Sequence, residues 1–139
     1  MSAKRKTTKA KKNDNTPRLV WFEIPADDIA RARKFYSSMF GWKIKPFPGM
    51  KDYMHIDTGG SDETLDGGLM VRKHPQQPIT NYVAVPSVEK AAAKVCKLGG
   101  QVCVGKTPVP GTGYFVVCQD TENNVFALWE RDDGAKPVS

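Results

Sequence analysis

The sequence predicts an α+β fold in which two paired βαβββ modules form an open, cup-shaped mixed sheet. The order of one strand, one helix and three strands occurs twice, over residues 17–73 and 79–131. Each copy is too small to bury its own sheet face, so the two are expected to pair around a shared hollow, within one chain or across a dimer. The length of 139 residues and the hydrophobic content of 40% suit a single globular domain.

The first module begins with an alternating apolar stretch, Leu19–Ile24, which predicts a strand. Residues 25–28 break the strand and supply an aspartate that can cap the next helix. Helical spacing then runs over Ile29–Phe40, and Gly41 is suited to end that helix. Proline and glycine signals separate three further predicted strands: Trp42–Phe47, Tyr53–Asp57 and Gly68–Arg72.

The second module repeats this order after a linker at residues 74–78. Thr80–Val85 is a predicted strand, and Val88–Leu98 is an amphipathic helix that two glycines close. The remaining predicted strands are Gln101–Lys106, Tyr114–Gln119 and Val125–Glu130.

The positive charge is concentrated at the N-terminus. Residues 1–16 hold six basic and one acidic side chain, whereas the rest holds fifteen basic and fourteen acidic ones. We expect residues 1–16 to be a disordered basic tail, either a leader or a weak electrostatic contact with an acidic partner, and residues 132–139 to be a flexible C-terminus. Specific nucleic-acid binding and membrane association are not predicted.

The three cysteines, Cys96, Cys103 and Cys118, are odd in number and lie in apolar segments, which predicts reduced, packed thiols. No secretory signal and no membrane-spanning run is recognisable in the sequence. These features predict a cytoplasmic protein.

Four stretches carry a resemblance to a known family: "WFEIPADDIARARKFYSSMFGW", "VPSVEKAAAKVCKLGGQV", "TPVPGTGYF" and "DTENNVFALWE". They resemble the vicinal oxygen chelate superfamily of glyoxalases, bleomycin resistance proteins and extradiol dioxygenases, over residues 17–131. Small bacterial glyoxalase-like proteins of unassigned activity are the most similar in pattern. The resemblance implies the glyoxalase/bleomycin resistance fold and, commonly, a homodimer.

The metal enzymes of this superfamily place histidine, glutamine or glutamate at four positions on the cup-facing strands. The resemblance puts three of these positions on Trp21, Thr80 and Ala127, and the fourth on the strand near residues 67–69, in a register that the sequence does not fix. Indole and methyl groups offer no ligand to a divalent cation. We therefore expect no metal cofactor; the alternative is Zn²⁺, Ni²⁺ or Fe²⁺ held by unfamiliar ligands.

Strand alternation predicts that Leu19, Trp21 and Glu23 face the cup. Glu23 is the candidate catalytic or ligand-binding carboxylate; the alternatives are a hydrogen bond to a loop amide or an ion pair with a lysine of a partner subunit. Glu63 and Asp66 are expected to be solvated in a polar loop. The predicted ligand-binding residues are Trp21, Glu23, Tyr82, Ala127, Trp129 and His55, with Met54 as the alternative to His55.

These expectations favour a metal-independent protein that holds a planar, neutral or cationic small organic molecule in an aromatic cup. One alternative is a lyase, isomerase or dioxygenase that uses Glu23 as general base. The other is an interaction module whose cup is filled by its own indoles.

Overall fold

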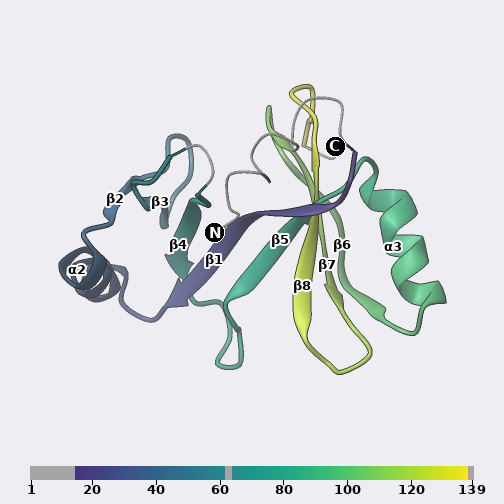
Figure 1. Cartoon of the computed structure of the whole chain (residues 1–139), viewed down its shortest axis with the longest axis horizontal. Helices are drawn as coiled ribbons and strands as arrows, with labels where there is room; N and C mark the ends of the chain where they lie inside the picture. The colour runs from purple at the N-terminus through teal and green to yellow at the C-terminus, as the bar shows by residue number, and fades with distance from the viewer. Residues whose placement is uncertain (1–14, 62–63, 138–139) are drawn as a thin grey trace, which may run out of the picture.

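The computed structural model describes residues 15–61 and 64–137 and contains one mixed sheet of eight strands with two helices. The strand order is β2-β3-β4-β1-β5-β8-β7-β6. At its centre β1 (Arg18–Ala26) runs antiparallel to β5 (Thr80–Ala84), and this pair joins the two modules (Figure 1). Both modules therefore belong to one continuous sheet within one chain, and the predicted α+β fold class is confirmed.

The first module has the predicted order of elements. Asp28 caps the first helix, because its side chain accepts a hydrogen bond from the Arg31 N–H group at 3.0 Å. The left-handed Gly41, with φ of 74°, ends this helix as expected. The elements after β1 are α2 (Ile29–Phe40), β2 (Lys43–Pro46), β3 (Tyr53–Asp57) and β4 (Gly67–Val71).

The second module differs from its prediction mainly in one edge strand. That strand runs to Val109 rather than Lys106, and its pairing is irregular between Val102 and Thr107, where an edge strand tolerates bulges. The elements after β5 are α3 (Val88–Lys97), β6 (Gln101–Val109), β7 (Gly113–Gln119) and β8 (Val125–Arg131).

Each helix packs on its own half of the sheet, and the helices lie at the two outer flanks of the molecule (Figure 1). One core cluster centres on Ile56 and Leu69 beside α2, and the other centres on Val116 and Cys118 beside α3. The sheet face away from these clusters is called the open face below. Its members include Trp21, Glu23, Tyr53, His55, Gly68, Thr80, Tyr82, Phe115, Ala127 and Trp129, as the strand register shows.

The expected orientation of Leu19 is wrong. The β1–β5 register shifts between Leu19 and Trp21, so Leu19 lies opposite Val83, whereas Trp21 lies opposite Tyr82. An extra residue in one strand reverses the alternation on one side of it. Strict alternation from Glu23 therefore gives the right face for Trp21 and the wrong one for Leu19.

Two cysteines are more exposed than predicted. Cys118 is buried, whereas Cys96 and Cys103 are exposed, and all three are free thiols. Burial raises the pKa of Cys118 to about 11, with a smaller contribution from the other two thiols.

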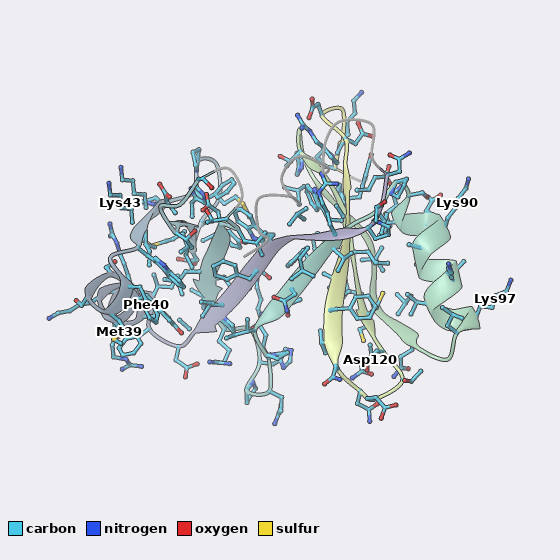
Figure 2. All side chains as sticks on the ribbon, viewed as in Figure 1. Met39, Phe40, Lys43, Lys90, Lys97 and Asp120 are labelled. Carbon is cyan, nitrogen blue, oxygen red and sulfur yellow. The ribbon has the colours of Figure 1, made fainter. Side chains whose placement is uncertain are left out.

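The described surface also includes α2, which has no fully buried residue. Met39 and Phe40 lie on this helix at the outer flank, and Lys90 and Lys97 project from α3 on the other side (Figure 2). Neither helix is long and apolar enough to cross a membrane, as far as the described residues go.

The ends of the chain are described only in part. The basic tail predicted for residues 1–16 lies outside the described residues except for its last two, as does Glu63. After β8 the chain turns back, and the buried Ala135 accepts a hydrogen bond from the Gly111 N–H group at 2.9 Å. Part of the segment predicted to be flexible is thus held against the β6–β7 turn.

Candidate functional site

Five neighbouring strands, β3, β4, β1, β5 and β8, bring the predicted site residues onto the open face. Trp21 lies opposite Tyr82, and Tyr82 lies opposite Ala127. On the side of β1 that pairs with β4, Glu23 lies opposite Gly68, and Gly68 in turn lies opposite His55 on β3. Residues from both modules therefore converge beside the β1–β5 junction.

Glu23 is held by two tyrosines, one from each module. The Tyr53 hydroxyl donates to Glu23 Oε2 at 2.7 Å, and the Tyr82 hydroxyl donates to Oε1 at 2.9 Å. The Trp21 Nε1–H group donates in turn to the Tyr53 hydroxyl at 3.0 Å. No ion-pair partner of Glu23 occurs among the described side chains, so hydroxyl groups alone stabilise this half-buried carboxylate.

These hydrogen bonds keep both tyrosines protonated. Burial raises the pKa of Tyr53 and of Tyr82 far above the ordinary value for a phenol. The negative charge of Glu23 raises both further, because a phenolate beside a carboxylate would be repelled. The tyrosines therefore act as fixed hydrogen-bond donors to Glu23.

Gly68 makes room for this arrangement. A Cβ atom at position 68 would lie 2.0 Å from the Tyr53 hydroxyl oxygen, far closer than atoms can approach. Any other residue would push the Tyr53 ring away from Glu23. The missing side chain at Gly68 is thus a requirement of the hydrogen-bond network.

His55 stacks on Trp21 and pairs with Asp66. The two rings are almost parallel, at 5°, with centroids 5.7 Å apart. His55 Nε2 lies 3.1 Å from Asp66 Oδ2, and the Thr58 N–H group donates to Asp66 Oδ1, also at 3.1 Å. The Thr58 hydroxyl makes a third contact with Asp66. Asp66 is therefore not a solvated loop residue as predicted, because three contacts from two residues hold it beside the site.

Further aromatic rings surround this centre. Phe47 packs edge-on against Trp21 and His55, and Phe115 packs edge-on against Tyr82. Trp129 lies farther along β8, opposite Phe115, and within the described part of the chain it makes no ring contact or hydrogen bond with these residues. The open face is thus aromatic in both modules.

The three positions that the resemblance assigns to metal ligands all lie on this face. They are Trp21, Thr80 and Ala127, and Gly68, on the strand that would carry the fourth, lies on the same face. None of these offers an imidazole, carboxylate or thiolate, and both oxygens of the adjacent Glu23 accept hydroxyl protons. Over residues 15–61 and 64–137, no group of three or more His, Cys, Asp or Glu is arranged to hold a metal ion.

Sequence reasoning missed Tyr53, Phe47, Phe115 and Asp66. The sequence could have predicted Tyr53, because this residue is two positions before His55 on the same strand and must share its face. The sequence could not have predicted the role of Asp66, because this residue follows a glycine-rich loop whose path the sequence does not specify.

Comparisons with known proteins support the resemblance. A family model described as bleomycin resistance protein-like N-terminal matches residues 18–59. A glyoxylase-like domain-containing protein of Didymella fabae is 32% identical over 117 residues, which cover 78% of this chain and 90% of that protein. The chain is also 29% identical to CFP32 of Mycobacterium bovis, over 79% of this chain but only 44% of that protein.

Solved structures share the fold. Streptomyces coelicolor methylmalonyl-CoA epimerase matches with a TM-score of 0.61 at 12% identity, over 86% of this chain and 98% of the epimerase. At such low identity, the similarity extends to the arrangement of the strands and helices alone.

Proposed function

Because the chain belongs to the vicinal oxygen chelate superfamily as a glyoxalase-like member, we propose that it binds a flat small organic molecule on its open face without a metal ion. The observation that carries this proposal is the Glu23 carboxylate, which two tyrosines hold among aromatic rings. A few directed polar groups within an aromatic surface are typical of small-molecule sites.

The hydrogen bonds of Glu23 favour binding over base catalysis by this residue. A general base must offer an oxygen to the proton that it removes. Each oxygen of Glu23 already accepts a short hydrogen bond from Tyr53 or Tyr82, which leaves less of the carboxylate free to take a proton from a ligand. The catalytic role predicted for Glu23 stays a prediction.

Metal independence is proposed from the chemistry of the donor set. Divalent transition metals in proteins require about three or four imidazole, carboxylate or thiolate ligands. Trp21, Thr80 and Ala127, at the three positions that the resemblance assigns to metal ligands, supply none, and neither does Gly68 on the strand that would carry the fourth. A metal site would need Glu23 to leave both tyrosines and would still lack further ligands.

Two measurements test this proposal. A library of aromatic fragments should contain compounds that saturably quench the fluorescence of Trp21 in a variant that lacks the other two tryptophans. Elemental analysis of protein purified without chelator should find Zn, Ni and Fe far below one atom per chain. Stoichiometric metal that disappears in Glu23→Gln would contradict the metal-independent site, and a complete lack of saturable quenching would contradict ligand binding.

A homodimer is proposed as the assembly state. α2 exposes Phe35 and Met39, which are 60% and 63% exposed, and apolar side chains of this size are frequently covered in an assembly. Light scattering should give twice the mass of one chain, and the mass of one chain would contradict the dimer.

A further inference from the structure

We propose that the open face selects ligands that donate hydrogen bonds, such as phenols and protonated amines. The donors at the centre of this face are already used within the protein, which leaves acceptors for the ligand. This inference names a ligand class for the proposed function and rests on it.

Three donors are consumed by the Glu23 network. The Trp21 N–H group donates to Tyr53, and the Tyr53 and Tyr82 hydroxyls donate to Glu23. An indole has one polar hydrogen, and so has a hydroxyl. None of the three groups can donate to a ligand unless this network breaks.

Asp66 fixes the donor of His55 in the same way. A carboxylate only accepts hydrogen bonds, so the 3.1 Å contact places the proton of the neutral imidazole on Nε2. The other nitrogen, Nδ1, then carries a lone pair, and no described residue donates to it or accepts from it. Thr80 donates to the Pro78 carbonyl oxygen at 3.4 Å and adds no free donor.

The groups that remain at the centre of the face, around Glu23 and His55, are acceptors. They are the second lone pairs of the Glu23 oxygens, the Tyr82 hydroxyl oxygen and His55 Nδ1. The His55 side chain is 39% exposed, so a ligand lying on the aromatic face can reach it. The cation nearest in register is Lys45, which lies opposite His55 on the edge strand β2 and is exposed.

A ligand without donors would leave these acceptors covered and unpaired. An unpaired polar group at an interface costs roughly tenfold in affinity or more. A carboxylate ligand would also be repelled by Glu23. The face should therefore discriminate between flat molecules of equal size by their polar hydrogens.

Four one-ring probes test this discrimination. Phenol and benzylammonium donate hydrogen bonds, whereas anisole and benzoate do not. Each is titrated at about pH 8, above the ordinary range of imidazole protonation, and binding is followed through the Trp21 indole N–H signal in NMR spectra. The Trp42 signal is the control for folding, because Trp42 packs on Phe22 and Tyr36 beneath α2.

We expect phenol and benzylammonium to bind about tenfold more tightly than anisole and benzoate. His55→Phe keeps a ring against Trp21 but removes Nδ1, and Glu23→Gln removes the charge. Each should reduce the preference at least about threefold, whereas His74→Phe in the linker should leave it unchanged. His55 and His74 are the two histidines of the chain, so this pair is a matched control.

Each result decides the inference. Anisole or benzoate binding as tightly as phenol overturns it and leaves the proposed function standing. A preference that survives both variants also overturns it, because the acceptors would then lie elsewhere. If no probe shifts the Trp21 signal while the Trp42 signal shows a folded protein, both the inference and the proposed function fail.

Discussion

At the residue scale, Glu23 is the side chain on which the site depends. Its charge lies between two phenols rather than beside a cation, so the pair of hydroxyls replaces an ion pair. Hydrogen bonds to a charged group are worth about 1.5–3 kcal/mol each, more than those between neutral groups. The same contacts help to raise the pKa of both tyrosines.

Alkaline titration measures this coupling. Tyr53 and Tyr82 should stay protonated above about pH 10, where ordinary tyrosines ionise, because burial and then the charge of Glu23 raise the pKa of both. The unfolded chain loses these protons first, so their contribution to stability is complete below about pH 10 and declines as the pH rises further. Ultraviolet absorbance of tyrosinate against pH follows the ionisation.

Glu23→Gln separates the two causes of that shift. The substitution removes the charge but not the burial, so both tyrosines should ionise at lower pH than in the natural chain and still above the ordinary value. Glu122→Gln in the exposed β7–β8 turn is the control and should change nothing. An unchanged titration in Glu23→Gln would show that the carboxylate does not act on the phenols.

At the element scale, β4 must approach β1 closely. A Cβ atom at Gly67 would lie 2.5 Å from the Phe22 carbonyl oxygen, which is backbone and cannot rotate away. At Gly68 the obstacle is the Tyr53 side chain, which can move. The same Gly-to-Ala change should therefore have different effects at two adjacent positions.

Three glycine variants test this difference. Gly67→Ala should lower the free energy of unfolding by about 1–3 kcal/mol, because the strands must separate. Gly68→Ala should stay folded but displace Tyr53, which would shift the Trp21 indole N–H signal. Gly105→Ala on β6 has open space around its Cβ and should change stability by less than about 0.5 kcal/mol. Urea unfolding gives the stabilities, and equal costs at positions 67 and 105 would contradict the close packing.

How far the sequence predicts this molecule differs between elements. The helices and strands follow from periodicity and capping residues, as Asp28 and Gly41 illustrate. The faces of Trp21 and Glu23 follow from alternation, but the irregular pairing that reorients Leu19 has no signal in local sequence. The Asp66–His55 contact depends on where a loop returns, which only tertiary packing determines.

At the scale of the whole molecule, the two modules have separate cores but share one sheet. Leu69 lies in the core of the first module and Leu128 in that of the second, and both are almost fully buried. The β1–β5 pairing and the Tyr82 contact to Glu23 cross between the modules. Each half thus exposes a central strand edge if the other unfolds, which is unfavourable because the backbone groups of that edge lose their partners.

This sharing predicts a single cooperative unfolding transition. Leu69→Ala and Leu128→Ala should each lower the free energy of unfolding by about 2–4 kcal/mol, because each removes buried methyl groups and leaves a cavity. In both variants the NMR signals of Trp42 in the first module and Trp129 in the second should disappear at the same urea concentration. If Leu69→Ala instead released the Trp42 signal while Trp129 stayed native, the modules would fold independently. The open face would then have to assemble from two units that are each stable alone, and the Tyr82 contact with Glu23 would be a late docking event.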